Sequence, residues 1–139
     1  RVRRQRQMCI RDRFTVAFAT VDTLTAADYV GIVSARNTSH KMDATGWTPT
    51  KGEHVNAPVY SCFPMTMECR IKTKLDESET GCYIIAEIVN IVCDERYLAA
   101  DGKPDVEKMR LITFDPVHNG YIELGRRVGN AFADGKKLK

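Results

Sequence analysis

The stretch Met65-Thr66-Met67-Glu68-Cys69-Arg70-Ile71-Lys72 decides the fold, because apolar and polar side chains alternate along all of it. Alternation with a period of two is typical of a half-buried β-strand. The nearby stretch 82–93 (CYIIAEIVNIVC) is almost continuously apolar and rich in Ile and Val. Such a run predicts a central strand that is buried on both faces. The acidic residues 75–80 between the two strands predict a turn or loop.

Shorter elements surround these two strands. Residues 14–18, 59–60 and 111–114 predict three more strands. Apolar residues at helical spacing predict a helix over residues 24–33, started by a capping box of Thr25 and Asp28. Further helical turns are expected around Tyr97-Leu98 and Val106–Met109, and a C-terminal helix along Leu124, Val128, Ala131 and Phe132.

These elements predict a mainly β fold with helical insertions, either a barrel or a sandwich. The four or five strands are too few to close a barrel, which needs about six to eight. The open edges would then have to be covered by another chain.

The stretch 34–49 (SARNTSHKMDATGWTP) carries basic side chains where a short helix should begin. Ser39 is a suitable N-cap and Gly46 a natural C-terminal stop. The N-terminus of a helix is electropositive and ordinarily attracts acidic side chains. The basic residues that crowd this end instead are Arg36, His40 and Lys41. Their charge favours a bound anion such as a phosphate group, and the alternative is a solvated basic surface.

Composition and charge are those of an ordinary globular domain. The 139 residues are 43% hydrophobic and 28% charged. No apolar run approaches the ~20 residues that span a bilayer, so no membrane partner is expected. Residues 1–13 hold six arginines and one acid, a local charge of +5, so the net charge of +3 leaves −2 for residues 14–139. An acidic body gives no support for nucleic-acid binding.

Residues 1–13 fit poorly with the rest, and the domain is expected to span residues 14–139. The segment has no amphipathic period and few apolar residues. One interpretation is a basic arm for RNA or acidic lipid. The favoured interpretation is a non-native or disordered basic segment, because residues 8–13 (MCIRDR) resemble translated sequencing-adapter text.

The five cysteines indicate neither a disulfide framework nor a metal site. Their number is odd, and none forms a C-x-x-C pair. No metal site is expected, since the three histidines lie far from them in sequence. A reducing, cytoplasmic setting is the simplest one for such thiols.

Several segments along most of residues 14–139 occur in a recognisable order. The clearest is DYVGIVSAR (28–36), followed by HKM (40–42) and TGWTP (45–49). The others are FTVAF (14–18), AP (57–58), MECR (67–70), IAEIV (85–89), DGKPD (101–105), GYIELG (120–125) and Phe132. Together they resemble the flavin reductase-like family, the FMN-binding split barrels that include flavoredoxins.

The resemblance implies a cofactor, an assembly and a set of binding residues. In such proteins a split barrel forms a homodimer with FMN near the subunit interface. Lys41 matches the family lysine that approaches the flavin phosphate, and Tyr121 matches an aromatic residue beside the flavin ring. Ser34 and Arg36 are further candidates for polar contacts, and no catalytic residue is assigned. The family's N-terminal strands have no counterpart here, which implies a split β-barrel truncated at its N-terminus.

The implied function is an FMN-binding oxidoreductase of the flavin reductase or flavoredoxin type. The bound flavin would carry the chemistry, with NADH, NADPH or a protein as the electron donor. Two alternatives stay open: a flavin-binding split-barrel module without turnover, and a β-rich structural or oligomerisation domain. Truncation also predicts weak FMN binding by these residues alone.

Other chemistry-bearing side chains have simpler interpretations. Glu87 is expected to pair with Arg70 or Lys72, because an acid in an apolar strand needs a partner. Trp47 is expected to pack within the protein rather than to stack on a ligand. His118 stands in a loop with no catalytic pattern nearby.

Overall fold

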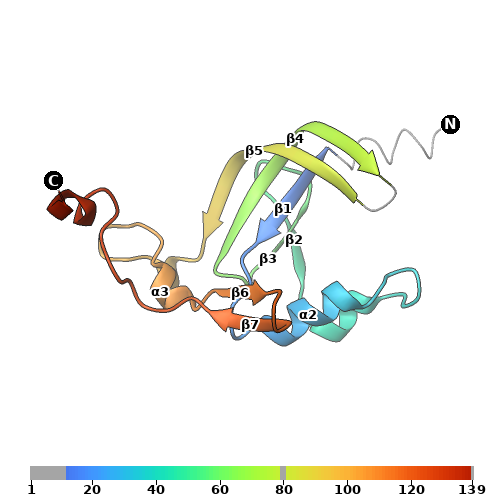
Figure 1. Ribbon diagram of the computed structural model, residues 1–139. Helices are drawn as coiled ribbons and strands as arrows, with labels where there is room; N and C mark the ends of the chain where they lie inside the picture. The colour runs from blue at the N-terminus through green and yellow to red at the C-terminus, as the bar shows by residue number, and fades with distance from the viewer. Residues whose placement is uncertain (1–11, 79–80, 139) are drawn as a thin grey trace.

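The computed structural model describes residues 12–78 and 81–138, and the seven strands within these ranges form three small antiparallel sheets (Figure 1). The largest sheet has the order β1-β4-β5, and the other two are the pairs β2–β3 and β6–β7. The strands are β1 (Arg13–Ala17), β2 (Pro49–Lys51), β3 (Pro58–Tyr60), β4 (Met65–Ser78), β5 (Gly81–Cys93), β6 (Ile112–Asp115) and β7 (Gly120–Glu123).

Short helices fill the connections between the sheets. They are α2 (Leu24–Ile32), α3 (Val106–Met109) and the 3₁₀ helices η1 (Lys41–Thr45), η2 (Glu95–Tyr97) and η3 (Asp134–Leu138). Figure 1 shows α2 and the β6–β7 pair below the long β4–β5 hairpin, with the C-terminal residues leading away from the body. A single bridge between Thr20 and Leu111 joins the approach to α2 with the approach to β6.

Strand β4 confirms the alternating pattern, and from Cys69 (3% exposed) onward Arg70 and Lys72 are exposed as expected, but burial is reversed at the start of the strand. Thr66 and Glu68, on the polar face, are fully buried, whereas Met65 and Met67 are half-buried. The loop that follows β2 covers the polar face, as the contacts of Glu68 show below. Residues 75–78, expected in a turn, belong to β4, because pairing with β5 continues to Ser78 opposite Gly81.

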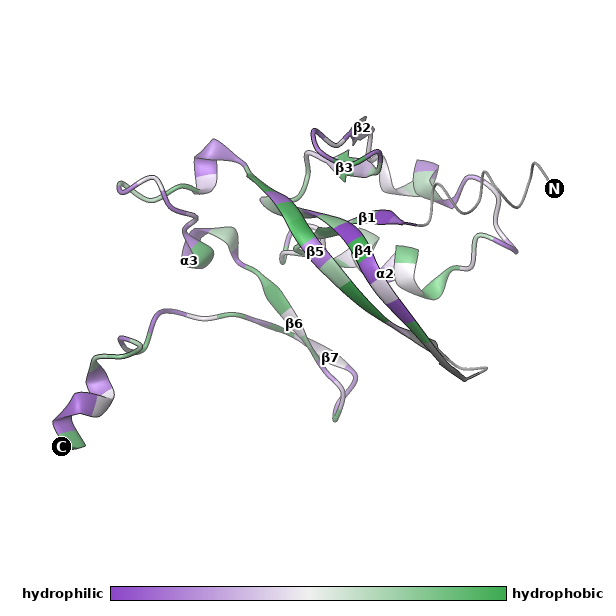
Figure 2. Cartoon of the chain, turned by 90° about the horizontal axis from the view of Figure 1, so that it is seen from above, coloured by the Kyte–Doolittle hydropathy of each residue, from purple (hydrophilic) through white to green (hydrophobic). Residues whose placement is uncertain are grey.

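Strand β5 is present as predicted, but the prediction of a central strand buried on both faces is wrong. It lies at the edge of its sheet, since only β4 pairs with it among the described residues. Figure 2 shows the hydrophobic colour along β5. More than half of the surface of four of its apolar side chains is exposed: Tyr83, Ile85, Ile88 and Ile91. The residues described here therefore leave apolar side chains along β5 uncovered.

Glu68 fixes the loop between β2 and β3. Its Oε2 accepts the N–H groups of His54 (2.7 Å) and Val55 (2.9 Å), and its Oε1 accepts the N–H of Glu53 (3.2 Å). The side-chain amide of Asn90 also donates to Oε1 (3.2 Å). Burial by itself raises the pKa of this carboxyl, but the four hydrogen bonds outweigh burial and hold the pKa below its ordinary value.

Two predicted helix features are wrong. Helix α2 spans nearly the expected residues, but its N-cap is Thr23, and no capping box forms at Thr25. Thr23 is buried and its hydroxyl accepts the N–H of Thr20 instead (2.9 Å). The helix predicted along Leu124, Val128, Ala131 and Phe132 is absent: residues 124–130 have no regular secondary structure and only η3 follows, in keeping with the low helix propensity of Gly125 and Gly129.

The remaining strand and turn predictions hold to within about a residue. Strands β1, β3 and β6 and the turns η2 and α3 stand where the sequence placed them, whereas β2 and β7 were not predicted. Strand β1 begins at Arg13, and the Asp12 carbonyl accepts the N–H of Ile71 (2.7 Å). The rest of the segment set apart in the sequence, residues 1–11, lies outside the described residues.

Candidate functional site

The basic segment that was expected to hold an anion does not form the expected helix. Lys41 begins the five-residue 3₁₀ helix η1, and His40 precedes it in the left-handed region (φ 60°). Ser39 is therefore not the N-cap, whereas Gly46 ends the helix as predicted (φ 67°). Because η1 is so short, an argument from a helix N-terminus does not apply to it. Any anion site here has to rest on side chains.

Lys41 reaches back to the C-terminal end of α2. Its Nζ donates to the carbonyl oxygens of Val30 (2.8 Å) and Val33 (2.7 Å). Carbonyls at a helix C-terminus lack intrahelical partners and carry partial negative charge, so a half-buried ammonium stabilises this end. An ammonium has three N–H donors, so two are used here and one remains for a ligand.

Tyr121 on β7 contacts the same helix. Its hydroxyl donates to Asp28 Oδ1 (2.6 Å), and its ring packs against that of Phe114, with 5.8 Å between the ring centres. The hydrogen bond to Asp28, together with burial and the negative charge of Asp28, raises the pKa of Tyr121. Tyr121 is 42% exposed, so part of the side chain is accessible to a neighbouring group.

Helix α2 therefore brings together the two leading candidates from the sequence. Tyr121 is held at Asp28 and Lys41 at Val33, five residues later in the chain. Nothing local in the sequence indicated that Asp28 would join β7 to α2, because its partner is 93 residues away.

Ser34 and Arg36 lie in the exposed loop between α2 and η1. The Ser34 Oγ accepts the N–H of Arg36 (3.2 Å), which leaves its hydroxyl proton to donate elsewhere. Across residues 12–78 and 81–138, no ion pair involves Arg36. His40 stands 3.8 Å from Asp43, and both are exposed. The loop thus offers donors close to Lys41 in the chain.

An open hollow of about 420 Å³ lies between α2 and η1. Thr23, Tyr29, Thr45 and Trp47 are among its lining residues. Trp47 packs against the rings of Tyr60 and Phe63, with ring centres 5.9 and 4.9 Å away. These contacts agree with the expectation that Trp47 is a packing residue.

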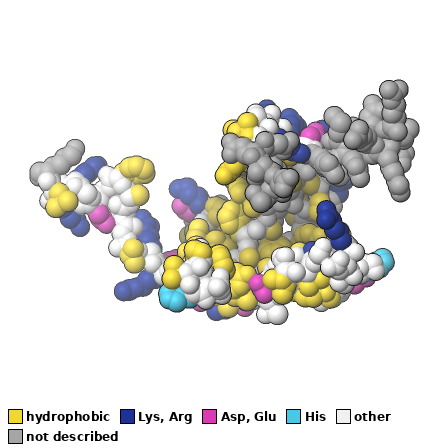
Figure 3. All heavy atoms as spheres, turned by 45° about the vertical axis from the view of Figure 1, so that its right-hand side comes forward, with side chains coloured by type: hydrophobic (Ala, Val, Ile, Leu, Met, Phe, Trp, Pro, Cys, Tyr) yellow, Lys and Arg dark blue, Asp and Glu magenta, His cyan; other side chains and the backbone are white. Residues whose placement is uncertain are grey.

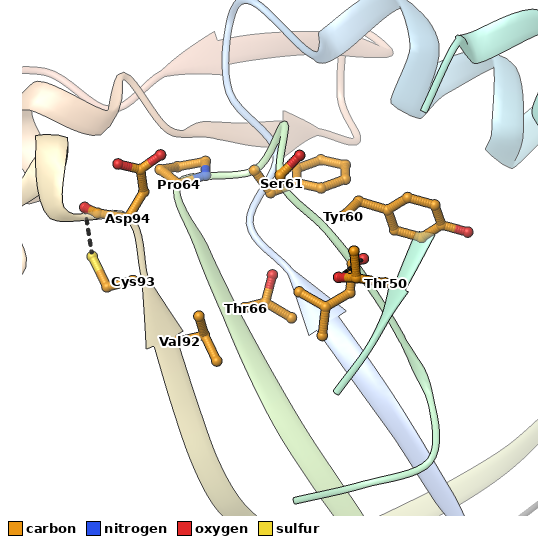
Figure 4. A pocket seen from close by; sticks show the side chains of 10 residues that line it. Thr50, Tyr60, Ser61, Pro64, Thr66, Val92, Cys93 and Asp94 are labelled. Carbon is orange, nitrogen blue, oxygen red and sulfur yellow. Dashed lines mark hydrogen bonds between the residues drawn. The ribbon is translucent and has the colours of Figure 1, made fainter. Parts of the chain in front are cut away.

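A second hollow, of about 270 Å³, lies where the ends of β4 and β5 meet the β2–β3 pair (Figure 4). Thr66 and Val92 line one side, Tyr60 lies on another, and the Cys93 thiol donates to the Asp94 carbonyl (3.6 Å). Burial and the charge of Asp94 raise the pKa of Cys93. A thiol held in the protonated form is a poor nucleophile, so this hollow shows no sign of covalent chemistry.

The other titratable groups form ordinary pairs. Glu87 forms an ion pair with Lys72, one of its two expected partners, with 2.7 Å between Oε2 and Nζ. His118 Nδ1 lies 2.7 Å from Asp115 Oδ2. In the part of the chain that the structure describes, no group of three His, Cys, Asp or Glu side chains could hold a metal ion. Within the same residues, no helix has the length and apolar character needed to cross a lipid bilayer.

Comparison with known proteins gives matches among solved structures. A scan against protein-family models finds no match, and a search of the curated proteins finds none. The flavoredoxin of Desulfovibrio vulgaris (Miyazaki F) has a TM-score of 0.83 and 33% identity, over 95% of this chain and 69% of that chain. A flavoredoxin from Methanosarcina acetivorans has a TM-score of 0.78 and 30% identity, over 90% of this chain and 64% of that chain.

More distant structures share the fold. The FMN-binding domain of a flavin reductases-like enzyme from Shewanella baltica OS155 is 16% identical, with a TM-score of 0.66 over 86% of this chain and 64% of that chain. These likenesses define a mainly β protein of the split-barrel class, as the sequence predicted. The chain belongs to the flavoredoxin and flavin reductase-like family of FMN-binding split-barrel proteins. It spans about two thirds of the flavoredoxin chains, in agreement with the expected truncated barrel.

Proposed function

We propose that this chain is an FMN-binding oxidoreductase of the flavoredoxin or flavin reductase type. Its 33% identity to a flavoredoxin over 95% of its length is the observation that carries the proposal. The contacts of Lys41 and Tyr121 with α2 support it, because the family resemblance links these two residues to the phosphate and the ring of one cofactor.

The donors around α2 fit the phosphate group of FMN. Lys41 keeps one N–H free of α2 and carries a positive charge, and Arg36 and the Ser34 hydroxyl supply further donors from the same loop. Hydrogen bonds from charged groups to phosphate are roughly twice as strong as neutral ones. Lys41 would thus bind the phosphate while its remaining donors hold the end of α2, and Arg36 and Ser34 would orient it.

Tyr121 would flank the flavin ring with its exposed side. Its hydroxyl is engaged by Asp28, so the ring orientation is set before any ligand arrives. When bound, the flavin supplies the redox chemistry by accepting electrons from a reduced nicotinamide, NADH or NADPH, or from a protein donor. In this proposal the chain's own residues bind and orient the cofactor.

The proposal includes a homodimer and a cytoplasmic setting. Four exposed apolar side chains along β5 favour a covering surface, which a second copy would supply in part. Cys62, Cys69 and Cys93 are free thiols, and free thiols persist in a reducing compartment.

A titration with two flavins tests the phosphate site. FMN and riboflavin differ only by the phosphate group, so the ratio of their dissociation constants isolates it. Quenching of flavin fluorescence would be measured for the chain, for Lys41→Gln and for the exposed control Lys51→Gln. We expect the chain to prefer FMN and Lys41→Gln to lose roughly tenfold of that preference, with riboflavin binding unchanged.

Three results would count against the proposal. Equal affinity for FMN and riboflavin would contradict a phosphate site. An equal loss of FMN preference in both lysine variants would show that overall charge, not Lys41, causes the preference. Failure to bind either flavin at millimolar concentration would refute flavin binding by this chain. For a flavin-binding chain, oxidation of NADH or NADPH in the presence of FMN separates an enzyme from a binding module without turnover.

A further inference from the structure

The residues after β7 form an extended arm that leaves the body of the protein. Residues 124–138 are called the arm here, and Figure 3 shows it standing away from the rest, with hydrophobic and basic side chains along it. Its root is attached by the N–H of Leu124, which donates to the Leu111 carbonyl (2.8 Å), and by the N–H of Arg127, which donates to Glu107. After Arg127, every hydrogen bond among the described residues joins two members of the arm.

The arm presents apolar side chains to solvent. Val128, Phe132 and Leu138 are 93%, 97% and 94% exposed. Phe132 also has a backbone φ of 62°, a left-handed conformation that is uncommon for an aromatic residue. Such a conformation persists where surrounding contacts determine it, and a side chain that is 97% exposed has no such contacts within its own copy. We therefore expect contacts from another molecule to determine the conformation of the arm.

The charge of the arm complements that of the body. The arm together with Lys139 contains five basic residues and one acid, a charge of +4, so with −2 for residues 14–139 the body of residues 14–123 carries −6. Opposite charges of this size attract two copies of the same chain, each offering one arm and one acidic body.

A receiving surface lies at the root of the arm. A hollow of about 530 Å³ is lined by the acids Asp101, Asp105 and Glu107 and by Val106, whose side chain is 47% exposed. The other lining residues are Ala99, Lys103 and Pro104 of the body and Gly125 and Arg127 of the arm. Lys103 pairs with Asp101 (3.2 Å), so three acids and one base of the body line the hollow. In a dimer with two-fold symmetry, each copy uses the same surface in both roles. If the two arms run antiparallel past each other, each arm crosses the hollow beside the root of its partner's arm.

We propose that the arm docks into this hollow on a second copy of the chain, with Phe132 as its apolar anchor, so that two arms are exchanged. Aromatic anchors in pockets commonly dominate the energetics of an interface, and basic residues around an acidic rim set the register. The inference rests on the homodimer of the proposed function and adds the surface that forms it. It is independent of flavin binding.

The first test measures the dimer of the 139-residue chain by sedimentation equilibrium in flavin-free buffer. We expect a dimer whose dissociation constant rises with ionic strength and rises roughly tenfold or more in Phe132→Ser. The matched control is Val117→Ser, an equally simple change at a 77% exposed apolar residue of the β6–β7 turn, which should leave the dimer unchanged. A monomer at all concentrations, or equal effects of the two variants, would overturn the proposal.

Complementation separates exchange between copies from folding back within one copy. One variant lacks residues 126–139, and the other carries Val106→Asp in the hollow. Each alone should be monomeric, whereas their mixture should form a heterodimer with one intact arm and one intact hollow. Absence of a heterodimer, with both variants folded by circular dichroism, would refute arm exchange. Because no flavin is present, this outcome is distinct from a failure of FMN binding.

Discussion

Replacing Glu68 by Gln is expected to be strongly destabilising, although it changes only one heavy atom. Glu68 is fully buried, and each carboxylate oxygen accepts two hydrogen bonds. A glutamine would place its oxygen at the Oε2 position to keep the two shortest bonds, from His54 and Val55. Its NH₂ group would then face the donors of Glu53 and Asn90.

The magnitude follows from the bonds that are lost. Two hydrogen bonds to a charged acceptor disappear, each worth about 1.5 kcal/mol or more, so the free energy of unfolding should fall by about 3 kcal/mol. Domains of this size unfold with about 5–15 kcal/mol, so the loss is a large share of the total. Urea unfolding at about pH 7 measures it. The control Glu87→Gln removes a carboxylate from the exposed pair with Lys72 and should have a much smaller effect.

The effect should also depend on pH. The pKa of Glu68 lies below its ordinary value, so its ionised form stabilises the fold fully above the unfolded pKa of about 4.3. That contribution is lost as the pH falls through the lowered folded pKa. The difference between the chain and Glu68→Gln should therefore shrink between about pH 5 and pH 2. A constant difference over this range, or a loss no larger than that of Glu87→Gln, would refute the reasoning.

Two further substitutions test the packing of the loop held by Glu68 and of the aromatic rings around Trp47. Gly52→Ala would place a Cβ 2.9 Å from the Glu68 carboxylate, and we expect about 1–3 kcal/mol of destabilisation by urea unfolding; unchanged stability would show that the loop relaxes freely. Trp47→Ala removes the ring contacts with Tyr60 and Phe63, so the free energy of unfolding should fall by about 2–3 kcal/mol and the near-ultraviolet circular dichroism signal should be lost. The control Trp47→Phe should retain most of the stability and most of that signal.

The sequence predicted local structure where the signal is local. Alternation along residues 65–72 located β4, and Gly46 marked the end of η1, because each depends on a few adjacent residues. The exposure of β5 could not be predicted, since burial of a strand depends on which neighbours are present. The missing helix after β7 has a local cause that the apolar spacing concealed, namely two glycines within five residues.

The candidate site was predicted in its residues but not in its contacts. The family resemblance pointed to Lys41 and Tyr121, and no property of the sequence indicated that both would contact α2. The sequence analysis did not identify Glu68 as an important residue, although an acid within a strand of alternating apolar residues indicates a need for hydrogen-bond partners. Its partners are backbone N–H groups of a loop that precedes it by 13 to 15 residues, and backbone donors cannot be identified from residue types.

Helix α2 has no fully buried residue, yet it is the element to which both Lys41 and Tyr121 are tied. A helix that is packed so lightly is a candidate for opening well below the free energy of global unfolding. Its opening would release the ammonium and the phenol in a single event. Amide hydrogens of α2 and η1 should then exchange together, and a ligand that bridges the two side chains should slow both sets by the same factor.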